Sequence, residues 1–324
     1  MSEDFIQGTQ GFGNVASRLM TNSGKPSALR TNDILQYDEW KEIDETVVRV
    51  TQERMNGVAD LRGAGLTYNV GNGLGKMSIQ WQTMSDTIEA DVNMAGVTEA
   101  QNDRPEFATN SMPLPIISRD FYYNIRELSA SRAMGDPLDT TTVEQATRNV
   151  IEKNEQMLFN GLGSIGDGSI YGYTTHPDRS QVSFYNDAWD ASATSGTDIL
   201  QDVLNMKQDL IDNGYYGPYT LYVPTNYSIV LDDDLKAESD KTVRQRLEEI
   251  EGVSMVKVAD FLSDDNVVMV QMSRDVVDLV VGMEPTTVQW EVYGGMQSAF
   301  KVMDIIVPRI KSTYNNKSGI AHLS

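Results

Sequence analysis

The chain has 324 residues, of which 40% are hydrophobic and 8% aromatic, a composition typical of a folded globular protein. It contains no cysteine, which excludes disulfide bonds and thiolate chemistry, and its net charge of −21 is opposite in sign to that of most nucleic-acid readers. Single cores seldom grow past about 250 to 300 residues, so the length predicts two compact parts.

The excess of acidic residues is large, with 47 Asp and Glu against 26 Lys and Arg. Like charges at this density repel one another, and at about 1 M salt the Debye length falls to roughly 3 Å, which screens the repulsion. Two hypotheses follow: a halophilic host such as a haloarchaeon, or an ordinary acidic mesophilic protein. The sequence leaves both open.

The first residues, Met1 to Phe5, are acidic and lack the basic and apolar regions of a signal peptide. No apolar run reaches the eighteen or so residues needed to span a bilayer. We therefore expect a soluble protein made in the cytoplasm, without contact to a membrane.

The N-terminal part predicts an arm followed by a helix. Residues 1–30 are rich in Gly, Ser, Thr and Asn and show no sustained period, which is typical of an arm rather than a domain. Further along, an apolar stripe at helical spacing predicts a helix that ends near Gly57. The stripe consists of Trp40, Ile43, Val47, Val50 and Met55.

Residues 67–117 change to extended chain with period-two alternation at both ends. Apolar Met77, Ile79 and Trp81 alternate with polar residues in the first part, and Met112, Leu114 and Ile116 alternate with prolines in the second. Prolines exclude a central strand. Because a two-stranded ribbon is at best marginally stable by itself in water, this hairpin should need a neighbour.

A long amphipathic helix is predicted from Thr141 to Gly161. Thr141 and Glu144 have the spacing of a capping box, and Gly161 supplies the stop. The apolar residues recur at three- and four-residue steps, which predicts one buried face. They are Val143, Ala146, Val150, Ile151, Met157 and Leu158.

The rest of the chain mixes helices and strands. Helices are predicted at 197–214 and 242–250, strands at 219–223, 255–258, 267–272 and 276–282, and longer alternating strands within 288–313. The apolar face expected for helix 197–214 is Ile199, Leu200, Val203, Leu204, Leu210 and Ile211.

Motifs that carry chemistry are few. Residues Gly161 to Gly166 match G-x-G-x-x-G, but they follow a helix instead of a strand, so a nucleotide site is not expected. The two histidines, His176 and His322, are expected in a loop and in the C-terminal tail. Neither a nucleophile-elbow motif nor a zinc-protease motif occurs.

Two acidic runs, Asp232–Asp234 and Asp264–Asp265, could bind a hard cation but fit solvated surface better. Asn226 and Asn316 lie in short glycosylation patterns that often arise by chance. We therefore expect no catalytic, cofactor-binding or metal-binding residues and no cofactor. An acidic hydrolase that uses an Asp or Glu pair stays open as an alternative.

Three runs within residues 113–161 resemble encapsulins and encapsulin-like viral major capsid proteins: 116–121 (IISRDF), 126–132 (RELSASR) and 135–141 (GDPLDTT). The Trp-x-x-Ile-Asp pattern at 40–44 and the C-terminal segments 278–282 and 300–302 are similar to that family as well. The resemblance implies an α+β chain with the HK97-like shell fold.

The resemblance also implies a domain plan. It comprises an N-terminal arm (1–30), a peripheral domain with a long spine helix (31–66, 118–165 and 286–324), an extended β-hairpin loop (67–117) and an α/β axial domain (166–285). Some shells of this type cross-link a Lys of the loop to an Asn of a neighbour, which here suggests Lys76 with Asn315 or Asn316.

The function implied by the resemblance is a structural one. The main hypothesis is a non-enzymatic viral major capsid protein that assembles in the host cytoplasm into an icosahedral head of hexamers and pentamers around double-stranded DNA. Its partners would be other copies of itself, weakly contacted DNA, a portal and decoration proteins. The alternative is an encapsulin-type nanocompartment shell protein that encloses a protein cargo.

Overall fold

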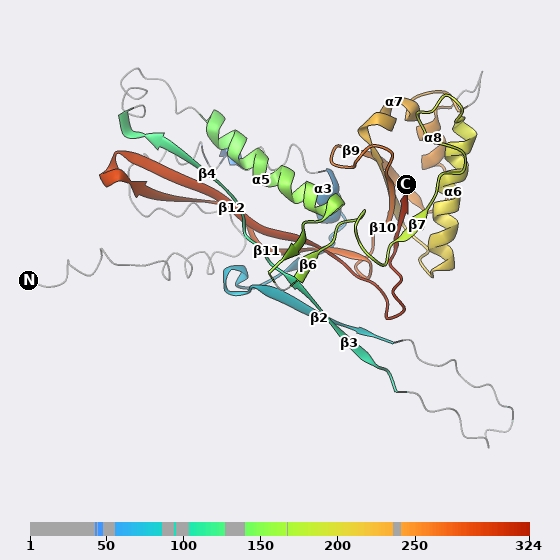
Figure 1. Cartoon of the computed structure of the whole chain (residues 1–324), viewed down its shortest axis with the longest axis horizontal. Helices are drawn as coiled ribbons and strands as arrows, with labels where there is room; N and C mark the ends of the chain where they lie inside the picture. The colour runs from blue at the N-terminus through green and yellow to red at the C-terminus, as the bar shows by residue number, and fades with distance from the viewer. Residues whose placement is uncertain are drawn as a thin grey trace, which may run out of the picture. The chain divides into compact units, whose positions relative to one another are not determined.

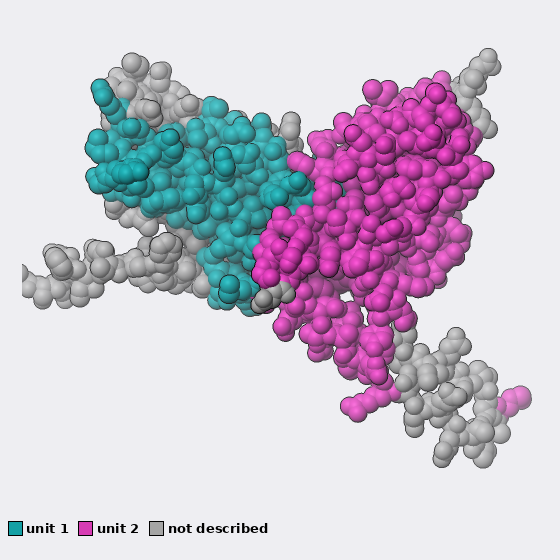
Figure 2. All heavy atoms as spheres, viewed as in Figure 1, with its two compact units in different colours: residues 1–77, 114–159, 278–308 teal, residues 78–113, 160–277, 309–324 magenta. Residues whose placement is uncertain are grey.

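The computed structural model describes residues 43, 45–47, 56–85, 94, 104–126, 140–166, 168–235 and 241–324. Figure 2 shows the chain as two compact units. Unit 1 comprises residues 1–77, 114–159 and 278–308, and unit 2 comprises residues 78–113, 160–277 and 309–324. Each unit is therefore assembled from segments that lie far apart in the sequence.

Unit 1 is built on a four-stranded sheet with the order β1-β11-β12-β4 (Figure 1). β1 runs parallel to β11, and β4 runs antiparallel to β12. The strands are β1 Thr67–Asn69, β4 Ile117–Asn124, β11 Val277–Val292 and β12 Gln297–Ile310, and the helices are α3 Asn56–Gly63, η2 Gly73–Gly75, α5 Thr141–Asn160 and η4 Tyr293–Gly295.

Helix α5 is the predicted long helix, and its ends are confirmed to within one residue. The Glu144 amide donates to the Thr140 carbonyl oxygen at 2.9 Å, which makes Thr140 the capping residue, one position before the expected Thr141. At the other end Gly161 has a φ of +71°, the left-handed conformation that Gly adopts without strain. All six predicted apolar residues of α5 are buried.

The core of unit 1 joins α5 to β4 and β12. Val143, Ala146 and Val150 of the helix pack with Phe121 of β4 and Phe300 of β12. The two phenyl rings stack with their centroids 5.1 Å apart. Ile43 and Val47 of the predicted first helix belong to the same core, whereas Trp40, Val50 and Met55 lie outside the described residues.

Gly57, near which the first helix is predicted to end, lies inside the later helix α3, and the end of the first helix falls outside the described residues. Gly57 is the second residue of α3 and is buried. A Cβ atom at this position would lie 2.7 Å from Leu158 Cδ2, so glycine is needed for the close approach of α3 to α5. The carboxylate of Glu155 accepts hydrogen bonds from the amides of Gly57 (2.6 Å) and Val58 (3.1 Å), and thereby satisfies the first turn of α3.

Unit 2 contains a five-stranded sheet with the order β7-β13-β10-β8-β9. Its strands are β7 Ser180–Val182, β8 Tyr219–Pro224, β9 Val253–Ala259, β10 Val267–Gln271 and β13 Ile320–Leu323. Helices α6 Gly196–Asp212, α7 Ser228–Leu231 and α8 Val243–Glu248, with η3 Thr225–Tyr227, accompany the sheet (Figure 1). Two short hairpins complete the unit: β2 Ser78–Met84 with β3 Phe107–Pro113, and β5 Gly163–Ile165 with β6 Gly168–Ile170.

Helix α6 buries a narrower face than the sequence predicts. Ile199, Val203 and Leu210 are buried as expected, but Leu204 is 38% exposed and Ile211 is only partly buried. Met206, absent from the predicted face, is fully buried. The helix turns 100° per residue, so a sheet on one side covers positions 199, 203, 206 and 210 and leaves 204 and 211 outside.

Two features of the strands also differ from expectation. β11 is a single strand of 16 residues that continues through Gly282 and Pro285, where two separate segments were predicted. The C-terminal strand β13 pairs with β10 and β7 in unit 2, although residues 286–324 were expected in one domain with the spine helix. Residues 278–285 lie in unit 1 rather than with the axial segment, and residues 78–113 lie in unit 2.

A buried carboxyl group lies between α5 and β12. Asp304 is fully buried, and its Oδ2 atom accepts a hydrogen bond from Asn154 Nδ2 at 2.6 Å. The pKa of Asp304 is raised to about 8, chiefly by burial; the Asn154 hydrogen bond and Arg62 lower it, and the nearby Glu284 carboxylate raises it. At neutral pH the folded protein therefore holds this group protonated.

We predict that Asp304→Asn removes a pH dependence of stability. The folded state binds one more proton than the unfolded state between the unfolded pKa of about 4 and the folded pKa of about 8, so the free energy of unfolding falls as pH rises through that window, by at most about 1.4 kcal/mol per pH unit. Urea denaturation at pH 5 and pH 8 measures the free energy of unfolding of both proteins. Between these pH values the wild type should lose more stability than the Asp304→Asn variant. Glu291→Gln, at an exposed position of β11, is the matched control. Equal pH slopes in the wild type and the Asp304 variant would contradict the assignment.

Candidate assembly site: the β2–β3 hairpin

The β2–β3 hairpin exposes the side chains of one of its two faces. Its register pairs Ile79 with Met112 and Trp81 with Asn110 on one face, which is partly to fully buried. On the opposite face Met84 lies across from Phe107, and these two side chains are 56% and 62% exposed. A cross-strand apolar pair of this kind gains stability when a further surface covers it.

The hairpin is held to the rest of unit 2 at several points. The Arg309 guanidinium lies over the Trp81 ring, 5.6 Å from its centroid, in a cation–π contact. Tyr314 Oη donates to Glu106 Oε2 at 2.7 Å, and this hydrogen bond raises the pKa of Tyr314. A Cβ atom at Gly168 of β6 would lie 2.7 Å from Pro113 Cδ. These contacts run from the base of the hairpin at Pro113 to its outer described end at Glu106, while the face with Met84 and Phe107 stays exposed.

Gly73, just before β2, lies very close to the backbone of β11. A Cβ atom at Gly73 would lie 2.3 Å from the carbonyl oxygen of Gly282 in β11, a distance that no side chain tolerates. Asn72 takes a left-handed φ of 60°, and its Oδ1 atom accepts from the Gly75 amide at 3.1 Å. The chain thus turns tightly against β11 before it enters the hairpin.

The two histidines lie in buried positions, and the expectation of a tail for His322 is wrong. His322 is in the middle of β13, and Arg179 Nε donates to its Nδ1 atom at 3.1 Å. Its Nε2 atom lies 2.7 Å from Asn266 Oδ1, which fits a neutral ring that carries its proton on Nε2. Burial, with a smaller effect of Arg179, lowers the pKa of His322 to about 4.

His176 lies in a turn before β7 and is also buried. Its Nδ1 atom accepts from the Asp178 amide at 3.2 Å, and burial lowers its pKa. Both rings are therefore neutral near pH 7 and act as parts of the hydrogen-bonded packing around β13. Neither is arranged as a nucleophile-activating base, since no hydroxyl or thiol is hydrogen-bonded to them in the described part of the chain.

The other candidate groups remain scattered. Within the described ranges no group of three or more His, Asp or Glu side chains could hold a metal ion. Asp232 accepts a hydrogen bond from Arg244 at 3.0 Å, and Asp265 accepts one from Tyr227 at 2.7 Å. Asn226, in one glycosylation pattern, is partly buried and donates to Asp265 at 3.2 Å, which leaves its amide poorly placed for modification. Asn316 is exposed.

The G-x-G-x-x-G run forms the start of the β5–β6 hairpin directly after helix α5. A Cβ atom at Gly161 would lie 2.6 Å from the carbonyl oxygen of Ile170, and Gly163 and Gly166 also have positive φ. These glycines serve a tight helix-to-hairpin turn and not a phosphate-binding loop. Among the helices that the structure describes, none is long and apolar enough to cross a membrane.

The proposed cross-linking pair is exposed, as its chemistry would require. Lys76, beside β2, and Asn315 and Asn316, in the turn before β13, all lie on the surface. Exposure permits a reaction between copies but does not test it. The cross-link therefore stays a prediction.

Similarity to solved structures identifies the fold. A virus-like particle protein from Pyrococcus furiosus superposes with a TM-score of 0.62 at 18% identity, covering 90% of this chain and 100% of that one. The capsid protein of Myoviridae phage XM1 gives a TM-score of 0.62 at 12% identity, covering 84% and 93%. The chain therefore has the HK97 fold, as the sequence resemblance implied.

By sequence, the type 1 encapsulin shell protein EncA of Myxococcus xanthus is 25% identical over 288 residues, 86% of this chain and 90% of that protein. The chain belongs to a family of unknown function, DUF6260, whose profile matches residues 28–323.

We predict that Gly73→Ala destabilises the fold by about 1 to 3 kcal/mol, because the added methyl group overlaps the Gly282 carbonyl and the backbone must shift. Gly71→Ala is the matched control two residues away, since a Cβ atom there would meet nothing within 4 Å. Thermal unfolding of the full chain measures both variants. Equal melting temperatures for the two would show that the approach of Gly73 to β11 is not a structural constraint.

Proposed function

We propose that this chain is the shell-forming subunit of a closed icosahedral particle. The observation that carries the proposal is the β2–β3 hairpin, whose Met84 and Phe107 pair stays exposed on a ribbon that cannot stabilise itself. In a shell, each hairpin would lie on a neighbouring copy and bury this surface at every repeat. Closed symmetry then adds many modest contacts into a stable particle.

Within this proposal, unit 1 corresponds to the peripheral domain with α5 as its spine helix, and unit 2 corresponds to the axial domain. The role is structural and not enzymatic, and it requires no cofactor or metal ion. Interactions between copies, rather than a pocket, would perform the function. The dispersed acidic and histidine groups of unit 2 agree with this, because they do not converge on a common site.

The first candidate for the contents is double-stranded DNA, which would make the chain a viral major capsid protein. Similarity to the phage XM1 capsid supports it. The net charge of −21 repels phosphates, so contact with DNA would be weak and non-specific. A portal and decoration proteins would be further partners in the virion, assembled in the host cytoplasm.

The second candidate is an encapsulin-type nanocompartment that encloses a protein cargo. The specific observation in its favour is the similarity to the EncA shell protein of Myxococcus xanthus over nearly the whole of both chains. Both candidates share the shell and differ in what it encloses.

We predict that the purified full chain forms closed icosahedral particles in negative-stain electron microscopy. Particles isolated from the natural source should contain nuclease-protected DNA if the shell is a viral head, and a co-purifying enzyme without DNA if it is a nanocompartment. The ratio of absorbance at 260 and 280 nm, with denaturing electrophoresis of the contents, separates the two. Uniform monomers at every salt concentration would contradict the shell.

We further predict that salt promotes assembly. Raising NaCl from about 0.1 M to 1 M shortens the Debye length from about 10 Å to 3 Å and reduces repulsion between subunits of charge −21. Light scattering should therefore report a larger assembled fraction at 1 M. Dissociation of preformed particles at 0.1 M would support the halophilic hypothesis, and their persistence would support the mesophilic one.

A further inference from the structure

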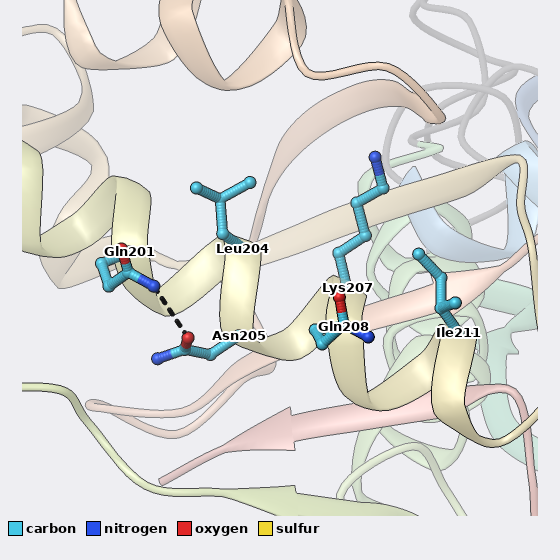
Figure 3. A pocket seen from close by; sticks show the side chains of 6 residues that line it. All are labelled: Gln201, Leu204, Asn205, Lys207, Gln208 and Ile211. Carbon is cyan, nitrogen blue, oxygen red and sulfur yellow. Dashed lines mark hydrogen bonds between the residues drawn. The ribbon is translucent and has the colours of Figure 1, made fainter.

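Helix α6 carries an uncovered stripe on its outer side. A shallow depression of about 340 Å³ is lined by Gln201, Leu204, Asn205, Lys207, Gln208 and Ile211. These residues recur at steps of three, four and seven, and in Figure 3 Leu204, Lys207 and Ile211 project to the same side of the helix. All six belong to one helix, so no opposite wall encloses a small molecule.

Leu204 and Ile211 form the apolar part of this α6 stripe. They lie seven residues apart, which places them almost directly above one another on the helix. The core of unit 2 takes the opposite face of α6 through Ile199, Val203 and Leu210. Helix α6 thus has apolar side chains on two sides, and within a single chain only one of these sides packs against the core.

The charge of the α6 stripe is unusual for this protein. None of its six residues is acidic, although the chain has 47 Asp and Glu. Gln201 Nε2 donates to Asn205 Oδ1 at 2.9 Å, and Gln208 Nε2 donates at 2.7 Å to the carboxylate of Asp212, an exposed residue at the C-terminal end of α6. Lys207 contributes a positive charge and donates to the Glu251 carbonyl oxygen at 2.6 Å.

We infer that the α6 stripe is a contact surface for a second copy of this chain. Two copies of charge −21 repel wherever carboxylates face each other, so a contact between them favours a surface without carboxylates. The stripe offers two apolar side chains at its centre, amides around them and one cation that complements the acidic surface of the other copy. This inference rests on the proposed shell and names one of its contacts.

Single-cysteine labelling tests this contact, because the chain has no cysteine of its own. We expect Gln208→Cys to react with a maleimide in free subunits and to be protected about tenfold or more in assembled particles, as at the core of a protein interface. Ser192→Cys, at an exposed position before α6, checks that the reagent reaches the particle surface. Equal labelling of Gln208→Cys in free and assembled protein would overturn the contact. If the cysteine is protected only after a different protein is added, the partner is not a second copy of this chain.

A charge variant provides a second measurement. Leu204→Glu should lower the assembled fraction at least about tenfold, since it places a carboxylate at the interface, while the melting temperature of the free subunit stays unchanged because the side chain is already exposed. Ser192→Glu, which places the same charge at an exposed polar position before α6, should assemble like the wild type. Normal assembly of Leu204→Glu, or an equal loss of assembled particles in both variants, would contradict the α6 contact but not the proposed shell. A wild-type chain that never assembles contradicts the shell itself.

Discussion

The packing of helix α5 on β4 and β12 is the interaction on which unit 1 depends. Segments from three distant parts of the sequence meet there, with Val143 and Val150 against Phe121 and Phe300. Removing apolar surface from water stabilises the folded state by about 25 cal/mol per Å² buried, and this is the main favourable contribution to folding. The Glu155 carboxylate accepts hydrogen bonds from two amides of α3 and so fixes the position of that helix on α5.

Two polar side chains are buried inside this interface. Asp304 and Asn154 lie between the helix and the sheet, where a charged carboxylate would be costly. The proton held by Asp304 avoids that cost at neutral pH. In a shell built from such units, each subunit would therefore lose stability at alkaline pH, in addition to any effect of charge repulsion between subunits.

The proposed assembly would account for features that are unfavourable in a single chain. The hairpin exposes Met84 and Phe107. Helix α6 leaves Leu204 exposed and Ile211 only partly buried, although its other side already packs in the core of unit 2. Exposed apolar groups of this kind mark surfaces for association. In the proposed shell, two chains of charge −21 would meet most easily at surfaces without carboxylates, and salt would weaken the repulsion between their remaining surfaces.

The sequence by itself determined the long helix α5, its stop at Gly161, the alternating hairpin strands and the family resemblance, because these depend on short-range periodicity and local capping chemistry. Only the tertiary structure decided which side of α6 is buried, that Gly57 lies inside α3 and that β13 with His322 joins the sheet of unit 2. These outcomes depend on partners far away in the chain: a sheet that covers one side of α6, a Leu158 that excludes a side chain at 57, and a β10 edge that pairs with the C-terminal strand. Periodicity reports that a residue can be buried, whereas the contact that buries it is a property of the whole fold.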